Sequence, residues 1–155
     1  MAGSVADRFA VVPASYLYLL DGDRVLLQQR RNTGYMDGHW AAGAAGHVEL
    51  NETVEACAVR EAAEELGIGV AEFDLEPLTV MQRTDGTANP LEQRVDWFFA
   101  ARRWDGRPQT REPDKCAALA WHLLSDLPTP MPDYERRVLH GMATGTLVAF
   151  THHGF

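Results

Sequence analysis

The chain has 155 residues, of which 46% are hydrophobic and 23% charged, so we expect one globular domain over residues 1–155. The net charge of −8, from 22 acidic and 14 basic residues, argues against a nucleic-acid polymer as partner but not against a small phosphorylated ligand. No apolar run is long enough to span a membrane, the start MAGSVADRFAVV does not resemble a secretory signal, and two isolated cysteines suit a reducing cytoplasm.

The first half of the chain predicts two strands, a loop and a helix. ASYLYLL (14–20) and RVLLQQR (24–30) are typical of strands joined by a tight turn at DGD. NTGYMDGHWAAGAAGH (32–47) is rich in glycine and small residues and is predicted to be a loop. A helix is expected to follow, capped by Asn51 or Thr53 and ended by Gly67.

The second half predicts further strands and a closing helix. LTVMQR (78–83) and RVDWFFAARRW (94–104) are expected to be strands, and the polar segment TDGTANPLEQ joins them. LAWHLL (119–124) is another short strand, and YERRVLHGM (134–142) has the pattern of a helix. The order of elements indicates an α+β or α/β fold with a mixed sheet and at least two helices.

The stretch REAAEEL (60–66) places three carboxylates on one face of the predicted helix. Glu61, Glu64 and Glu65 lie at i, i+3 and i+4, where like charges repel, and Arg60 is the one cation in the stretch. A solvated helix face is one interpretation. The other is a divalent cation, because hard cations bind carboxylate oxygens.

The longer stretch GHVELNETVEACAVREAAEELGI, Gly46 to Ile68, resembles the signature of the Nudix hydrolases. Its fixed positions are occupied by Gly46, Glu52, Arg60, Glu61, Glu64, Glu65 and Gly67, and its apolar positions by Ala62 and Ile68. The resemblance implies a Nudix-type α/β/α sandwich with a mixed β-sheet and a loop-helix-loop catalytic box. It also implies dependence on Mg²⁺ or Mn²⁺ and hydrolysis of a nucleoside diphosphate linked to another group. We expect a monomer or a homodimer.

The resemblance also implies residue roles. The implied metal ligands are Ala45, through its carbonyl, and Glu61, Glu64 and Glu65, which are also the implied catalytic carboxylates. The implied structural residues are Gly46, Glu52, Arg60 and Gly67, with Glu52 and Arg60 pairing across the box. Glu112, in REPDKC, is a further catalytic candidate, as a metal ligand or a base; a solvated loop acid is the alternative.

The predicted substrate-binding residues are Arg30, Trp40, Met131, Asp133 and Tyr134. The resemblance implies that PMPDYE lies where relatives that bind nucleobases place an apolar or aromatic residue and an Asp or Asn. On that basis Asp133 is expected to read a base edge while Met131 or Tyr134 packs on the face of the base. The alternative is a proline-rich turn in which Asp133 caps the last helix. For Trp40 the alternative is a place in the core.

The leading functional prediction is a Mg²⁺-dependent pyrophosphohydrolase acting on a small nucleotide. Markers of the ADP-ribose and dinucleoside polyphosphate hydrolases are absent at Arg83 and at residues 84–86, which leaves nucleoside triphosphates. WAAGAAGHVE is similar to isoprenoid-diphosphate isomerase relatives, a second possibility, but the cysteine of those enzymes is replaced by Ala45 or a neighbour. A non-catalytic nucleotide sensor is the third, and the intact box argues against it.

Overall fold

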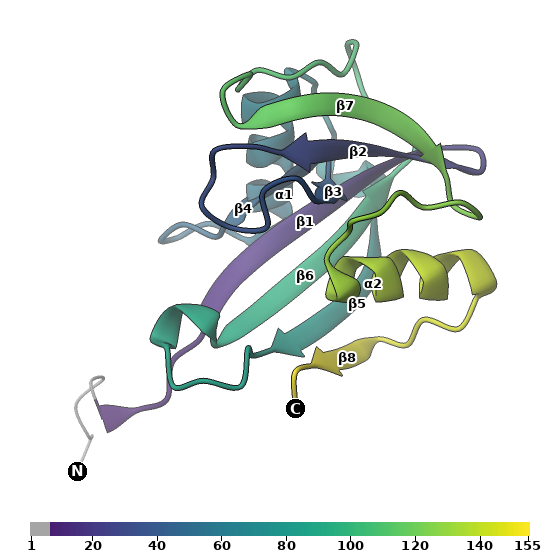
Figure 1. Cartoon of the computed structure of the whole chain (residues 1–155). Helices are drawn as coiled ribbons and strands as arrows, with labels where there is room; N and C mark the ends of the chain where they lie inside the picture. Colours follow the sequence, from purple (N-terminus) through teal and green to yellow (C-terminus); the bar gives the residue numbers. More distant parts are fainter. Residues whose placement is uncertain (1–6) are drawn as a thin grey trace.

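The computed structural model describes residues 7–155, so the first six residues of the predicted domain lie outside the described part. The fold is built on a mixed sheet of eight strands (Figure 1) in the order β3-β2-β1-β6-β5-β8, with β4 paired to β1 and β7 paired to β2. The strands are β1 Val12–Asp21, β2 Arg24–Arg30, β3 Trp40–Ala42, β4 Ala44–His47, β5 Leu75–Arg83, β6 Arg94–Ala101, β7 Cys116–Leu123 and β8 Phe150–His153. The helices are α1 Val54–Glu61 and α2 Asp133–Thr144, and short turns η2 Ala62–Leu66, η3 Glu72–Asp74 and η4 Pro90–Glu92 complete the fold.

The central strand β1 divides the core into two layers. Its side chains alternate between the faces of the sheet, as the period of a strand requires. Tyr16, Tyr18 and Leu20 pack in a cluster that includes Val138 and Leu139 of α2. On the other face, Leu17 and Leu19 pack in a cluster with Ala58, Ala62 and Leu66 of the α1 segment. The predicted α/β/α sandwich is therefore confirmed, with β1 parallel to β6 and antiparallel to β2 and β4.

The predicted loop at 32–47 is wrong in its second half, because β3 and β4 form there. Alanine makes up most of β3, and alanine and glycine most of β4, and both residue types have weak strand propensity. Their neighbours determine the outcome, because β3 pairs with β2 and β4 pairs with the buried strand β1. The edge strand β8 was likewise not predicted, and it pairs in parallel with β5.

The box helix begins and ends as the sequence predicts, but its last turn differs. Thr53, not Asn51, is the N-cap, and its hydroxyl accepts a hydrogen bond of 3.1 Å from the amide of Ala56. After α1 the chain continues through a π-helical turn, η2, and ends at Gly67, whose φ of 68° is left-handed. This π turn carries Glu64 and Glu65.

The closing helix α2 starts one residue earlier than predicted. Its N-cap is Pro132, so the interpretation of Asp133 as the N-cap is wrong. Proline at this position has the extended conformation that leads the chain into the helix. None of the described helices is both long and apolar enough to cross a membrane.

Candidate active site

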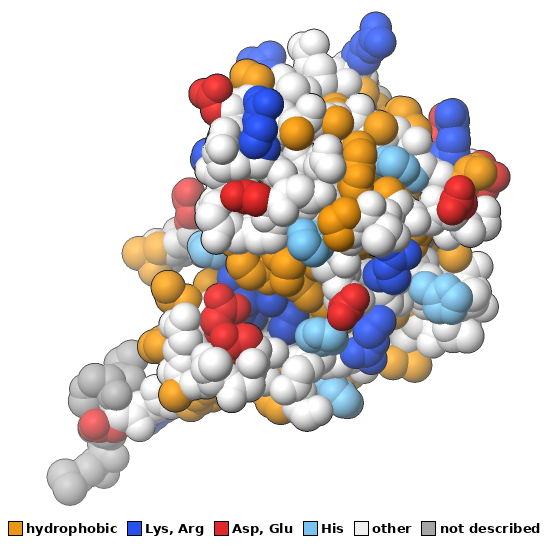
Figure 2. Space-filling model, in the orientation of Figure 1, with side chains coloured by type: hydrophobic (Ala, Val, Ile, Leu, Met, Phe, Trp, Pro, Cys, Tyr) orange, Lys and Arg blue, Asp and Glu red, His pale blue; other side chains and the backbone are white. Residues whose placement is uncertain are grey.

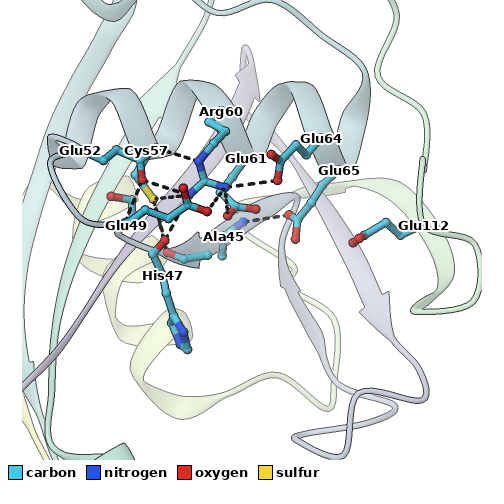
Figure 3. Close-up of polar contacts among 12 residues, drawn as sticks. Ala45, His47, Glu49, Glu52, Cys57, Arg60, Glu61, Glu64, Glu65 and Glu112 are labelled. Carbon is cyan, nitrogen blue, oxygen red and sulfur yellow. Dashed lines mark hydrogen bonds and ion pairs between the residues drawn. The ribbon is translucent and has the colours of Figure 1, made fainter.

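Arg60 is the centre of an ion-pair network between α1 and the loop before it (Figure 3). Its Nε lies 2.7 Å from Glu52 Oε2, and its Nη1 lies 2.8 Å from Glu61 Oε1 and 3.2 Å from Glu64 Oε2. Its Nη2 also donates to the backbone carbonyl of His47, at 3.1 Å. Hydrogen bonding to Arg60 lowers the pKa of Glu52 to about 2. The guanidinium therefore offsets the charge of several carboxylates and ties strand β4 to the helix.

Gly46 in β4 is the point where the strand passes closest to the box helix. A Cβ added at this position would collide with the carboxylate of Glu61. The missing side chain is therefore what gives Glu61 its place beside the strand. Burial, the largest effect, raises the pKa of Glu61, although Arg60 partly opposes that rise.

Glu65 lies in the wall of the cavity and is held by the backbone of β4. Its Oε2 accepts a hydrogen bond of 2.9 Å from the amide of Ala45. Burial raises its pKa to about 8, and the charges of Glu61 and Glu112 contribute to the rise. In Figure 3 the carboxylate of Glu112 points toward that of Glu65. The loop acid predicted from REPDKC is thus brought to the box, while Glu112 also lies 3.7 Å from Lys115.

The carboxylates do not form a closed metal cage in this structure. Within residues 7–155, no group of three or more His, Cys, Asp or Glu side chains is arranged to hold a metal ion. Arg60 lies between Glu61 and Glu64, on the carboxylate face where a divalent cation was predicted. The residues still fit Mg²⁺ or Mn²⁺, because Glu61, Glu64, Glu65 and Glu112 supply carboxylate oxygens. After burial, the charges of Glu61 and Glu112 contribute to the raised pKa of Glu65.

A cavity of about 350 Å³ opens beside Glu65 and runs across β1 to the start of α2. Figure 2 shows the hollow on this face, with hydrophobic and Lys or Arg side chains at its base. Of the predicted site residues, those lining the cavity are Arg30, Ala45, Gly46, Glu65 and Tyr134. His47 also lines it, with its Nε2 3.4 Å from Nη1 of Arg94, and burial lowers the pKa of His47.

Three predicted substrate-binding residues are not part of the cavity lining. The ring of Trp40 packs edge-on against His122, with 4.5 Å between the ring centroids. Met131 is 5% exposed and belongs to the core cluster under α2. Asp133 is exposed at the start of α2, where it lines a separate groove with Arg136 and Arg137. Of the predicted substrate-binding residues, Arg30 and Tyr134 therefore line the cavity, and Trp40, Met131 and Asp133 do not.

The floor of the cavity carries charged residues that were not predicted from the sequence. Arg83 of β5 is 6% exposed and its Nε lies 2.8 Å from Oδ2 of Asp96, which is fully buried on β6. The guanidinium of Arg83 also lies over the ring of Tyr134, 3.9 Å from its centroid. Glu135, next along α2, is 1% exposed and lines the same cavity. The available signal was the occurrence of charged residues within otherwise apolar strands.

Comparisons with known proteins agree with this arrangement. The NUDIX domain family model matches residues 11–142. A crystal structure of a MutT Nudix hydrolase from Burkholderia pseudomallei has a TM-score of 0.76 and 30% sequence identity, covering 84% of this chain and 97% of that chain. A mutator MutT protein from Bacillus halodurans shares the fold, with a TM-score of 0.73 and 21% identity over 92% of this chain and 90% of that one.

Two curated relatives are longer than the chain. An isopentenyl-diphosphate Delta-isomerase from Roseobacter denitrificans is 32% identical over 113 residues, 72% of this chain and 63% of that protein. An uncharacterized Nudix hydrolase from Rhodococcus erythropolis is 33% identical over 117 residues, 73% of this chain and 62% of that protein. The chain thus spans less than two thirds of either relative. The match to the family model, by contrast, runs from the start of β1 into α2 and includes the box and the cavity walls. This chain belongs to the Nudix domain family.

Proposed function

We propose that this protein is a divalent-metal-dependent hydrolase that cleaves a diphosphate bond in a small nucleotide. The position of Glu65 carries the proposal. Its carboxylate is fixed by the amide of Ala45 and lines the cavity, and its pKa is raised first by burial and then by the charges of Glu61 and Glu112. Carboxylates gathered at a cavity wall are suited to binding a cation together with the phosphates of a substrate.

In this proposal Glu61, Glu64 and Glu65 hold Mg²⁺ or Mn²⁺, which when bound supplies charge neutralisation and a more acidic water. The protein contributes orientation. Ala45 fixes Glu65, and Arg60 fixes Glu61 from the other side through its 2.8 Å contact. Because these contacts set the carboxylates before the ligand arrives, less ordering remains for the reaction itself.

The rest of the cavity supports an anionic ligand. Arg30, Arg83 and Arg94 all line it, in a chain whose net charge is −8. Arg83 and Arg94 both pair with Asp96, at 2.8 and 3.3 Å, whereas Arg30 has no ion pair among the described residues, so Arg30 is better placed to meet phosphate oxygens. The aromatic rings of Tyr16, Tyr35 and Tyr134 line the same cavity and suit the flat ring of a nucleobase.

A panel of nucleoside diphosphates, triphosphates and nucleotide conjugates, assayed with Mg²⁺ and with excess EDTA, tests the function. We expect release of phosphate or pyrophosphate that requires the metal and falls by about a hundredfold or more in Glu65→Gln. Glu55→Gln is the matched control, since Glu55 is an exposed acid in α1, the helix that leads into the turn of Glu65, and lies outside the cavity lining. Turnover that survives EDTA after removal of bound metal would refute the proposal, and binding without turnover would favour the sensor.

An isomerase of isoprenoid diphosphates is the second candidate, favoured by the 32% identity to the relative from Roseobacter denitrificans. The chain lacks a cysteine at Ala45, which faces Glu65. The nearby Cys57 is buried below β4, and burial raises the pKa of its thiol to about 11, which makes it a poor acid–base group near neutrality. Incubation with isopentenyl diphosphate distinguishes the two, because an isomerase forms an isomeric diphosphate and releases no phosphate.

A further inference from the structure

Glu135 is a buried carboxylate in the cavity wall for which the proposed hydrolysis has no use. It is 1% exposed and sits in the first turn of α2. One oxygen, Oε1, accepts two hydrogen bonds, from the hydroxyl of Tyr18 at 2.8 Å and from the amide of Ala42 at 2.8 Å. These contacts fix the carboxyl group between β1 and β3.

The other oxygen of Glu135 is available to a ligand. Among residues 7–155, Oε2 has no hydrogen-bond partner, although it can accept two hydrogen bonds. The described side-chain atoms that are both sealed from solvent and unpartnered are His39 Nδ1 and His122 Nε2, so Oε2 keeps contact with the cavity. A buried acceptor held rigidly on one side and open on the other is a recognition element, because leaving it unpaired against a ligand is costly.

The surroundings of Glu135 suit a flat, polar ring. The rings of Tyr16 and Tyr134 meet edge to face there, with centroids 6.4 Å apart. Arg83 stacks over Tyr134, and the charges of Arg30 and Arg83 both act on the Glu135 carboxyl. Glu65 lines the same cavity from the box side. A nucleotide with its phosphates near Glu65 therefore has space for its base at the α2 side.

We propose that Glu135 Oε2 accepts a hydrogen bond from an N–H group of the substrate nucleobase and so determines which bases the enzyme accepts. This inference rests on the proposed function, since it needs a nucleotide in the cavity. A site built around a fixed acceptor discriminates strongly against a ligand that lacks the matching donor. Glu135 is thus a specificity residue, separate from the carboxylates of the box.

The substitution Glu135→Gln tests the proposal with almost no change of shape. The amide oxygen can keep the hydrogen bonds from Tyr18 and Ala42, while an NH₂ donor replaces Oε2 at the cavity. Calorimetric binding of AMP, GMP, CMP and UMP is measured without metal at pH 8.5, where Glu135 with its pKa of about 7 is ionised. The nucleotide that binds wild-type protein most tightly is expected to bind Glu135→Gln at least about tenfold more weakly.

A second test changes the ligand and leaves the protein as it is. The same nucleotide is methylated at the base nitrogen whose N–H group is proposed to donate to Glu135 Oε2. We expect wild-type protein to bind the methylated nucleotide about tenfold more weakly, and Glu135→Gln to discriminate little between the two. Tyr18→Phe is the control, because it removes one bond to Oε1 and leaves Oε2 in place. Equal loss in Tyr18→Phe, or unchanged affinity in Glu135→Gln, overturns the inference while the proposed function stands. If wild-type protein neither binds nor hydrolyses any nucleotide, both the inference about Glu135 and the proposed function are refuted.

Discussion

Arg60 joins the strand and the helix of the box, so its removal should affect both stability and rate. It contacts Glu52, Glu61 and Glu64 and the carbonyl of His47, and its side chain is only 24% exposed. In Arg60→Ala these acids lose their common cation, and we expect a loss of about 2 kcal/mol in the free energy of unfolding together with slower hydrolysis.

Urea denaturation followed by circular dichroism measures the stability change. Arg102→Ala is the matched control, since Arg102 pairs with Glu76 at 3.3 Å while both side chains are about half exposed. A pair of that kind contributes little, so this variant should change stability by less than about 1 kcal/mol. Equal effects in the two variants would contradict the role given to Arg60.

Gly46 should tolerate no side chain, because the Glu61 carboxylate takes the space. In Gly46→Ala the added Cβ collides with Glu61, which must move away from β4. We expect metal-dependent turnover to fall by about tenfold or more while the protein stays folded. Gly69→Ala is the control, because the nearest atom to its added Cβ, on Asp105, lies at an ordinary 3.8 Å. Normal kinetics in Gly46→Ala would show that Glu61 is not needed at this position.

Glu135 should make stability depend on pH in a definite direction. Burial raises its pKa from 4.5 to about 7, so between these values the folded state holds a proton that the unfolded state has lost. The stabilisation is present in full below the unfolded pKa and is lost as the pH rises through about 7, by about 3 kcal/mol.

Urea midpoints from pH 4.5 to 8 in wild-type protein and Glu135→Gln check this prediction. The raised pKa of Glu65 also makes stability fall as the pH rises. Glu65 is present in both proteins, so the difference between their stabilities reports on Glu135 alone. The stability of Glu135→Gln relative to that of the wild-type protein should increase as the pH rises. Parallel curves would mean that Glu135 keeps its ordinary pKa.

At the residue scale, the spacing of residues along the sequence predicted the Nudix box. It did not predict the charged residues at the floor of the cavity. Gly46, Arg60 and Gly67 stand at fixed distances along one segment, so local sequence was enough to propose their roles. Arg83 and Asp96 lie 13 positions apart on two strands, and their pairing depends on the register of β5 with β6. The orientation of Glu135 likewise depends on Tyr18 and Ala42, which are distant in sequence and donate hydrogen bonds to its carboxylate. No local pattern contains that information.

At the element scale, the strands that were not predicted from the sequence are those that depend on pairing with a neighbouring strand and not on their own strand propensity. AAGH forms β4 because it pairs with residues 14–17 of β1, not because alanine and glycine favour strands. That pairing brings the amide of Ala45 to Glu65. The strands with strong periodicity, β1 and β2, were predicted within a few residues.

The end of the box helix gives a prediction at the same scale. Gly67 has a φ of 68°, and a Cβ there would also lie 3.2 Å from Cδ of Arg111. Gly67→Ala should therefore lower the free energy of unfolding by about 1–2 kcal/mol, and the π turn that carries Glu64 and Glu65 should loosen. Hydrogen exchange of residues 62–66 measures that loosening, with Gly69→Ala, which has no positive φ, as the control. Unchanged protection in Gly67→Ala would show that the glycine does not hold the turn.

At the scale of the whole molecule, the sheet brings two distant segments to one cavity. Glu65 follows α1 on one side of the sheet, and Tyr134 and Glu135 begin α2 on the other, yet all three line the same cavity of about 350 Å³. Ala45 and Gly46 of β4 also line this cavity, where the amide of Ala45 holds Glu65 and the absence of a side chain at Gly46 leaves room for Glu61. The small residues of β4 therefore serve the site, although they favour strands only weakly.

This arrangement predicts the products from a nucleoside triphosphate. With the base held at Glu135 and the box carboxylates at the other side, the inner phosphates lie nearest Glu65. Developing charge is best neutralised there, so water should yield a nucleoside monophosphate and pyrophosphate. Hydrolysis in ¹⁸O-labelled water, with mass spectrometry of both products, shows which phosphorus is attacked. Orthophosphate and a diphosphate as first products would place the outermost phosphate at the box, and would contradict this orientation of the substrate without removing the chain from its family.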